Sequence, residues 1–345
     1  MSRASELAEG IAEAVEERID TDGPGVAILV VEEGEVVHAK GYGLADLSGQ
    51  PITAHSVFDL ASLSKHITGM ATSLLIERGR IAPEDPVAQH VRALQLEEEG
   101  RAITIQDLLW HVSGLPDYTG DAWDGTDEEF ARLTPAGLVA WLNGQELVSA
   151  PGVEHVYNNS GYALLARVVE EVSGQSYASF VEANLFRPLG MKHTVALDSL
   201  SRKLPNRVTG YTSKGGKVKK AFNPTVIQGD GNVFTCIADL ALWEIGLQRA
   251  KLVSRAALER AWTSGTLDDG STIEDENGYG YGYGWCVDAD EDSPSISHDG
   301  SWGGTATSYV RYLDDEVSII MLSNDDDADL EGLQGAVEEV VYAEE

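Results

Sequence analysis

The chain is 345 residues long and 43% of its residues are hydrophobic, which suits one large globular unit or two intertwined ones. It carries 24 Lys and Arg against 57 Asp and Glu, for a formal net charge of −33. Nucleic-acid binding needs cations that replace phosphate counterions, so this charge excludes it and also disfavours anionic membrane surfaces. The acids are spread along the whole chain. That pattern is typical of halophilic proteins, which work in concentrated salt, although an ordinary acidic protein would show it too.

The cysteine and histidine content gives no sign of a metal or cofactor. Two isolated cysteines, Cys236 and Cys286, make neither a disulfide framework nor a metal site, and the eight histidines are scattered. The N-terminus has no basic segment followed by an apolar core, so no signal peptide is predicted. No apolar run is long enough to span a bilayer. We therefore expect a cytoplasmic protein without cofactor, metal or membrane partner.

The first 80 residues predict a helix, a hairpin and a second helix. Apolar residues at helical spacing favour a helix over residues 3–20. Residues 25–32 and 35–43 are two β-rich runs around a tight turn, which predicts a hairpin. A second amphipathic helix is expected from Ser62 to Gly79, where the glycine is a plausible stop.

The middle of the chain, from about 80 to 224, predicts short helices joined by long loops. Candidate helices cover residues 104–111, 135–143 and 160–174, with Gly and Pro marking the connections. Strand patterns return after about residue 225.

The C-terminal third predicts strands followed by one helix. Residues 278–285 alternate glycine with aromatic residues, so we expect a strand with its aromatics on one sheet face. Residues 305–312 and 316–323 predict a second hairpin, and residues 329–342 a last helix. Strands at both ends with helices between predict one sheet built from both termini, with a helical insertion.

The one Ser-x-x-Lys of the chain, Ser62 to Lys65, opens the second helix. The two side chains then lie one turn apart on the same face, and the positive helix N-terminus favours an alkoxide on Ser62. A neutral Lys65 amine could take the Ser62 proton if burial or a nearby cation lowers its pKa. The alternative is an N-capping serine beside a surface lysine, because chance alone makes such a tetrapeptide common.

Two further short motifs hold candidate site residues. Tyr157 and Asn159 precede a helix: the tyrosine could relay protons, and the asparagine amide could orient an acyl group. A capping Asn beside a packed Tyr is the alternative. His298 and Gly300 end a predicted strand, where a glycine lets a substrate approach the backbone. The backbone N–H groups of Ser301 and of the nucleophile could then form an oxyanion hole, unless the segment is only a strand-end turn.

The order Ser-x-x-Lys, Tyr-x-Asn, His-x-Gly resembles the motif set of the penicillin-binding-protein and serine β-lactamase superfamily, which includes class C β-lactamases, DD-peptidases, D-aminopeptidases and esterases. The phrase LLWHVSGLPDY and segments such as Pro188-Leu189-Gly190-Met191 are similar to it as well, and the resemblance covers about residues 25–325. No Gly-x-Ser-x-Gly elbow occurs, which argues against an α/β-hydrolase.

The resemblance implies an α/β (α+β) fold, in which an antiparallel sheet flanked by helices comprises residues 1–80 and 225–345. A mostly helical domain of residues 81–224 is inserted, and the active site lies between the two parts. The resemblance also implies site roles, which are as follows: Ser62 is acylated, Lys65 and Tyr157 handle protons, and Asn159, His298, Gly300 and Ser301 bind substrate.

The resemblance leaves the activity open. His298 stands where penicillin-binding proteins and true class C β-lactamases carry Lys, so a carboxylesterase acting on small neutral esters is favoured. A D-amino-acid peptidase or DD-peptidase, or a weak β-lactamase, is the alternative within the superfamily. A catalytically silent binding or scaffold protein is the alternative outside it. The expected partner is a small-molecule ester or amide.

Overall fold

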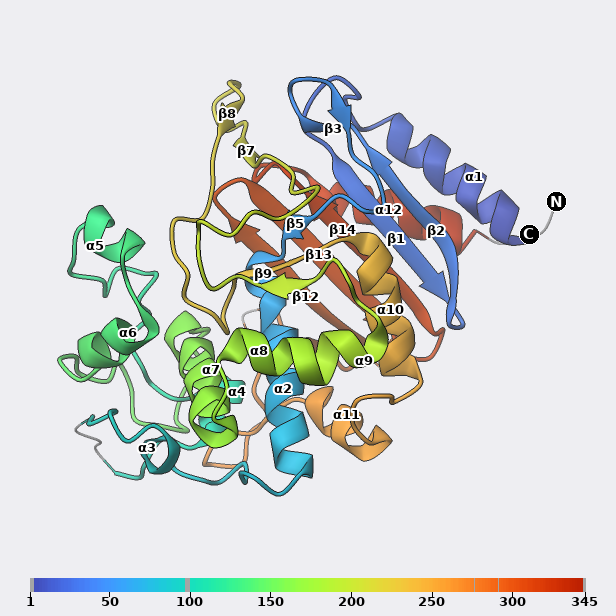
Figure 1. Ribbon diagram of the computed structural model, residues 1–345. Helices are drawn as coiled ribbons and strands as arrows, with labels where there is room; N and C mark the ends of the chain where they lie inside the picture. Colours follow the sequence, from blue (N-terminus) through green and yellow to red (C-terminus); the bar gives the residue numbers. More distant parts are fainter. Residues whose placement is uncertain (1–2, 97–99, 276, 291, 344–345) are drawn as a thin grey trace.

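The computed structural model describes residues 3–96, 100–275, 277–290 and 292–343, so the outermost ends of the predicted ranges lie outside the described residues. Its centre is a seven-stranded antiparallel sheet in the order β10-β11-β12-β13-β14-β1-β2 (Figure 1). Strands from the two ends of the chain pair directly, β1 with β14. The predicted fold class and the sheet built from both termini are therefore confirmed. The sheet strands are β1 Val26–Glu32, β2 Glu35–Tyr42, β10 Gly280–Tyr281, β11 Cys286–Asp288, β12 Ser295–Trp302, β13 Thr305–Tyr312 and β14 Val317–Ser323.

Short helices and strand pairs make up the rest of the described chain. The helices are α1 Arg3–Glu16, α2 Lys65–Glu77, α3 Val87–His90, α4 Ile105–Leu109, α5 Asp127–Ala131, α6 Pro135–Leu142, α7 Asn159–Ser173, α8 Tyr177–Val181, α9 Arg187–Leu189, α10 Ile237–Gln248, α11 Arg255–Ala261 and α12 Leu330–Val341. A 3₁₀ turn, η1 Ala61–Ser64, and a π turn, η2 Glu182–Phe186, join them. The minor strands are β3 Leu44–Asp46, β4 Gln50–Pro51, β5 Phe58–Asp59, β6 Val195–Ala196, β7 Tyr211–Thr212, β8 Lys219–Lys220 and β9 Val233–Thr235. In the described part of the chain, no helix combines the length and hydrophobicity needed to cross a membrane.

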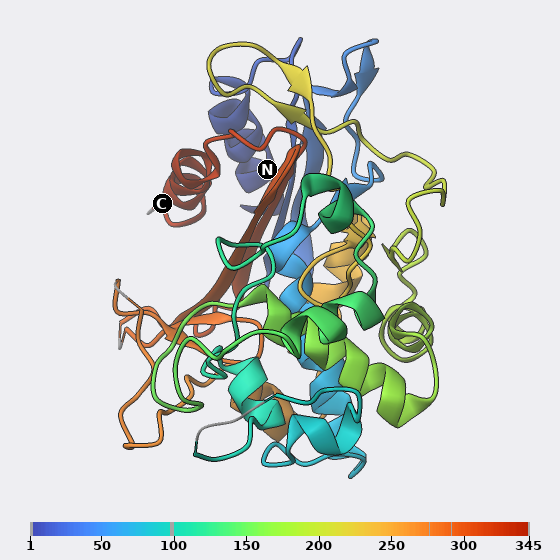
Figure 2. The same cartoon turned by 90° about the vertical axis from the view of Figure 1, so that its left-hand side faces the viewer.

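Helices cover both faces of the sheet, which explains why β1 is an almost unbroken apolar run. Alternate residues of a strand point to opposite faces, and β1 is buried on both. Val26 and Ile28 face a core with Ile11 of α1 and Val337 of α12. The alternating residues Ala27 and Leu29 join the larger core with α2, α7 and α10. Figure 2 shows α12 on one side of the sheet and the helices of the middle of the chain on the other.

Most of the predicted elements are present. Both hairpins are confirmed; the pairing of β13 with β14 is continuous, whereas that of β1 with β2 shifts register between Val30 and Val31. The predicted N-terminal helix ends at Glu16, four residues early, and the last helix covers Leu330–Val341. The structure also contains α10 and α11, which the strand-dominated prediction after residue 225 missed. The division of the chain into a sheet domain and an inserted domain stays a prediction.

The prediction of one strand over residues 278–285 is wrong. Only Gly280–Tyr281 is a strand, and the chain turns before β11 begins. The glycines serve close backbone packing instead: a Cβ on Gly282 would lie 2.2 Å from the Ala261 carbonyl oxygen, and one on Gly284 would lie 2.5 Å from that of Lys65. The alternation of glycine and aromatic residues therefore reflects glycines that pack against neighbouring backbone, not a pleated strand.

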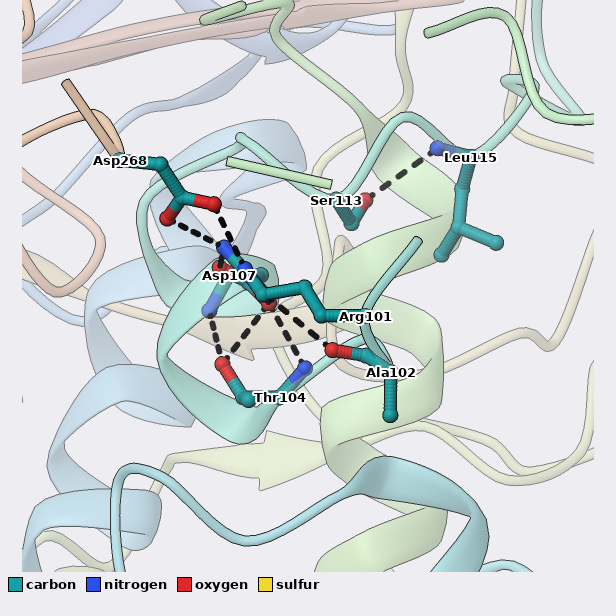
Figure 3. Close-up of polar contacts among 7 residues, drawn as sticks. All are labelled: Arg101, Ala102, Thr104, Asp107, Ser113, Leu115 and Asp268. Atoms are coloured by element: carbon teal, nitrogen blue, oxygen red, sulfur yellow. Dashed lines mark hydrogen bonds and ion pairs between the residues drawn. The ribbon is translucent and has the colours of Figure 1, made fainter. Parts of the chain in front are cut away.

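Arg101 joins the middle of the chain to the segment before β10. Its guanidinium donates to both carboxylate oxygens of Asp107, at 2.6 and 2.9 Å, and to both of Asp268, at 2.8 and 2.9 Å (Figure 3). Asp107 also completes the capping box of α4 with Thr104. The Asp268 backbone N–H donates to the Gly152 carbonyl, 2.9 Å away. These two bidentate ion pairs of Arg101, together called the fork, hold the loop that leads to Tyr157.

The fork leaves no room for a side chain at residue 152, which generates a test. Gly152 has φ +80°, and a Cβ there would lie 2.2 Å from Arg101 Nη2 and 2.4 Å from Asp268 Oδ1. Gly270 is a matched control, because its φ is +86° but nothing lies within 4 Å of its Cβ position. Gly270→Ala should cost about 1–2 kcal/mol of unfolding free energy for the left-handed backbone. Gly152→Ala should cost about 1–3 kcal/mol more for the clash. Equal costs in denaturant unfolding would show that the fork does not constrain this loop.

Candidate active site

Ser62 and Lys65 form the centre of the candidate site. Ser62 lies in the 3₁₀ turn η1, and Lys65 is the first residue of α2. A continuous α-helix from Ser62 was expected, so the prediction was wrong for its first turn. In 3₁₀ geometry, side chains three residues apart eclipse each other. Lys65 Nζ accordingly lies 3.2 Å from Ser62 Oγ.

Lys65 is completely buried, and its ammonium has three acceptors. Besides Ser62 Oγ, it donates to Asn159 Oδ1 at 2.7 Å and to the Asp230 carbonyl oxygen at 3.1 Å. Burial lowers the pKa of Lys65 to about 8, and the carboxylates of Asp230 and Asp117 oppose this shift. A substantial fraction of the amine is therefore neutral at mildly alkaline pH, where its lone pair can take the Ser62 proton. The alternative of a surface lysine is excluded.

Tyr157 is the third member of the group. Its ring centroid lies 4.7 Å from Lys65 Nζ, and its hydroxyl hydrogen-bonds with the Ser62 side chain. Burial raises the pKa of Tyr157 far above its usual range, and the bond to Ser62 opposes the rise. Although 39% of the residue is exposed, the phenol is therefore neutral at pH 7–8. A neutral phenol can donate a proton and relay one, but it is not a resident base.

The Asn159 amide is held by the protein. Its Nδ2 donates to Asp117 Oδ2 at 3.0 Å and to Thr119 Oγ1 at 2.8 Å, and its backbone N–H also donates to Asp117. These bonds turn Oδ1 toward Lys65. This contact positions Lys65, and the substrate binding expected of Asn159 stays a prediction.

His298 is buried, and both of its ring nitrogens are engaged. Nδ1 lies 2.6 Å from the Asp299 carbonyl oxygen, and Nε2 lies 3.0 Å from the Tyr281 hydroxyl. A carbonyl only accepts, so the hydrogen is on Nδ1 and Nε2 accepts from Tyr281. Burial and the nearby Lys65 lower the pKa of His298 to about 3, so the ring is neutral. The expected neutral imidazole is present, but it offers a bound substrate no free N–H.

The strand beside the nucleophile has an open edge where the sequence placed the oxyanion hole. β11 pairs only with residues 295–297 of β12, so no described strand pairs with β12 on that side from His298 onward. The Asp299 carbonyl points to this unpaired side of β12, where it accepts the hydrogen bond from His298 Nδ1. Backbone groups two residues apart in a strand point the same way. The Ser301 N–H therefore faces the open edge, as an oxyanion donor must.

Gly300 packs closely against the turn that carries the nucleophile. A Cβ there would lie 2.5 Å from the Leu60 carbonyl oxygen and 3.1 Å from the Leu63 backbone nitrogen. The glycine thus lets the turn that carries Ser62 pack against β12. Gly300 also lines the cavity beside Ser62, so its expected role in admitting substrate stays a prediction.

A cavity of about 900 Å³ opens beside Ser62 and extends over β12 and β13 to the start of α12. Tyr157, His298 and Ser301 line it near the nucleophile. Further along, its described lining has six acids and neither Lys nor Arg; the acids are Asp288, Asp290, Asp299, Asp326, Asp329 and Glu331. The described lining of this cavity therefore offers an anionic substrate no cation.

Sequence reasoning missed an aromatic cluster behind Tyr157. The ring of His111 lies 4.5 Å from those of Tyr157 and Tyr281, and its Nδ1 accepts the Asn158 backbone N–H. His155 also stacks near Tyr281. The eight histidines are thus not all scattered, although no group of three metal-ligating side chains occurs among the described residues. The phrase LLWHVSGLPDY contains His111 and was the available signal.

Comparison with known proteins assigns the chain to a family. Residues 11–341 match the family model named Beta-lactamase. The chain belongs to the β-lactamase family. It is 30% identical to Penicillin-binding protein 4* of Bacillus subtilis (strain 168), over 92% of this chain and 72% of that protein. It is 29% identical to the putative penicillin-binding protein PbpX of the same strain, over 69% of this chain and 58% of that protein.

Solved structures agree with this assignment. The octameric penicillin-binding protein homologue from Pyrococcus abyssi superposes with a TM-score of 0.79 at 27% identity, covering 93% of this chain and 73% of that one. EstCE1, described as a hydrolase with promiscuous acyltransferase activity, gives a TM-score of 0.83 at 20% identity over 99% of both chains. At that identity the likeness shows the fold. The family confirms the resemblance drawn from the three motifs.

The shared environment of Lys65 and Tyr157 predicts how activity depends on pH and on mutation. Lys65 must be neutral to accept the Ser62 proton, so kcat/KM for an ester should rise with pH through about 8 and level off above it. Lys65→Ala and Tyr157→Phe should each lower kcat by about 100-fold or more, because each removes one step of a single proton path. The double variant should be little worse than the worse single variant in steady-state assays. Fully additive losses would mean that the two side chains act independently.

Proposed function

We propose that the protein is a serine hydrolase that forms an acyl-enzyme on Ser62, and that small neutral esters are its best substrates. The observation that carries this proposal is the buried Lys65 amine 3.2 Å from Ser62 Oγ. Lys65 removes the Ser62 proton, Tyr157 passes a proton to the leaving group, and the N–H groups of Ser62 and Ser301 stabilise the oxyanion. A silent scaffold protein would have no need of a buried, partly neutral lysine.

The preference for neutral esters rests on charge. Penicillins, cephalosporins and D-alanyl-D-alanine termini carry a carboxylate beside the scissile bond. His298 is neutral and fully hydrogen-bonded, and the cavity is lined by six acids. A carboxylate entering this cavity meets like charges, which disfavours binding. A neutral ester avoids that penalty.

A second candidate is an amidase for substrates with a free amine. The same acidic lining that repels carboxylates attracts ammonium groups. A D-amino acid amidase from Ochrobactrum anthropi SV3 has the same fold, with a TM-score of 0.79 at 20% identity. Assaying the D and L enantiomers of an amino-acid p-nitroanilide separates this candidate from the esterase.

A comparison of two substrates tests the ester preference. We expect kcat/KM for p-nitrophenyl butyrate to exceed that for a chromogenic cephalosporin by at least about tenfold, equivalent to about 1.4 kcal/mol. His298→Lys should narrow the gap by adding a cation, whereas the neutral control His298→Gln should not. If the wild-type protein prefers the cephalosporin at mildly alkaline pH, the ester preference is wrong.

A further inference from the structure

The side-chain carboxylate of Asp230 is buried beside Ser62. The residue is 7% exposed and lies in the turn before β9. Its backbone is fixed to the site, because its carbonyl oxygen accepts from Lys65 Nζ. The preceding Gly229 has φ +105°, and a Cβ there would lie 2.3 Å from the Tyr162 carbonyl oxygen on α7. The turn is therefore held tightly between α7 and Lys65.

The two oxygens of this carboxylate are not equivalent. Oδ2 accepts a hydrogen bond from the Tyr118 hydroxyl at 2.7 Å. Oδ1 is buried and accepts none from the described residues. Leaving a buried acceptor without a donor destabilises the protein, and more so when the acceptor is charged. A partner of another kind, with an O–H or N–H group, would offset that cost.

A small cavity joins Asp230 to Ser62. It has a volume of about 10 Å³, which is about the lower limit for one water molecule. Ser62, Asp230, Tyr118, Asn159 and Asn232 are among the residues that line it. It is distinct from the substrate cavity, and Ser62 is the one described residue that lines both.

We propose that Asp230 is the base of the second half-reaction, and that it holds the hydrolytic water in this small cavity beside Ser62. The proposal rests on the acyl-enzyme mechanism proposed above. It gives the two halves of the reaction two different bases. Lys65 serves acylation, and Asp230 serves deacylation.

The proposed step balances without any further reactant. The water oxygen attacks the acyl carbon while one water proton moves to Asp230 Oδ1. The tetrahedral intermediate then collapses, the bond from carbon to Ser62 Oγ breaks, and Oγ takes a proton back through Lys65 and Tyr157. The products are free Ser62 and a carboxylic acid. Asp230 releases its proton to solvent, and solvent returns one proton to the Lys65 and Tyr157 relay that reprotonated Oγ, so the protons balance.

Two other acids near the site do not fit this role. Asp117 is fully engaged: Oδ1 accepts from Thr119, and Oδ2 accepts from Asn159. Asp59 accepts the Ala61 backbone N–H and is not among the residues that line the small cavity. Asp230 alone among these three has a buried oxygen without a donor and a cavity shared with Ser62.

Asp230→Asn tests the proposal, because it removes the base and keeps the side-chain shape. With p-nitrophenyl butyrate, we expect a burst of about one p-nitrophenol per site, followed by a steady-state rate at least about 100-fold below that of the wild type. Intact mass spectrometry should find butyryl-Ser62 accumulating in the variant. The matched control is Asp239→Asn: Asp239 is equally buried but binds His193 and Thr194 away from the site. It should not accumulate the adduct.

Tyr118→Phe keeps the test decisive if Asp230→Asn does not fold. Burial, the largest effect, raises the pKa of Asp230 to about 6; the positive Lys65 and the Tyr118 hydrogen bond oppose this rise, and Asp117 adds to it. Losing the Tyr118 bond should raise this pKa further. The acid limb of the deacylation rate should then move to higher pH while the burst is unchanged. A purely structural role for Tyr118 would not move this limb.

Each outcome is decisive. A burst and a steady-state rate that fall together in Asp230→Asn, or a steady-state rate within about threefold of the wild type, would overturn the role of Asp230 alone. Absence of a butyryl-Ser62 adduct in both the wild type and Asp230→Asn would contradict the proposed function, and with it this inference.

Discussion

The burial of the Lys65 amine is the constraint on which the rest of the site depends. A lysine in water is a cation at neutral pH and cannot accept the proton of a serine. Here the loss of water lowers its pKa to about 8, and three acceptors fix the position of Nζ. The fold must therefore close tightly around the start of α2 without placing a full counter-ion against the amine.

Glycines make that closure possible. A Cβ on Gly69 would lie 2.2 Å from the Tyr283 carbonyl oxygen, and one on Gly300 would lie 2.5 Å from that of Leu60. The chain before β11 and the open edge of β12 can consequently contact the nucleophile turn backbone to backbone. The acids near Lys65 then limit how far burial lowers its pKa. Asp117 acts through Asn159, and Asp230 contacts Nζ only through its carbonyl, so both raise the pKa of the amine without forming an ion pair with it within 4 Å among the described residues.

Local sequence pattern predicted the parts of the fold and site that depend on local interactions. The two hairpins and the helices around residues 135–143 and 160–174 follow from alternation, turn residues and caps. The Ser62 and Lys65 pairing depends on spacing alone and could be predicted too. What could not be predicted depends on contacts between distant segments. The sequence pattern alone could not show that Gly284 packs on Lys65, that His298 donates its N–H to the Asp299 carbonyl, or that Asp230 lies beside Ser62.

Covalent labelling tests most directly whether Ser62, activated by Lys65, is the acylated residue. Wild-type protein should react with a fluorophosphonate probe at a single serine, and Ser62→Ala should abolish the labelling. Ser64→Ala is the matched control, because Ser64 is fully buried and accepts the Val233 backbone N–H, so its removal should leave labelling intact. Labelling of Ser62→Ala at the wild-type level, or its loss in a folded Ser64→Ala variant alone, would contradict the account.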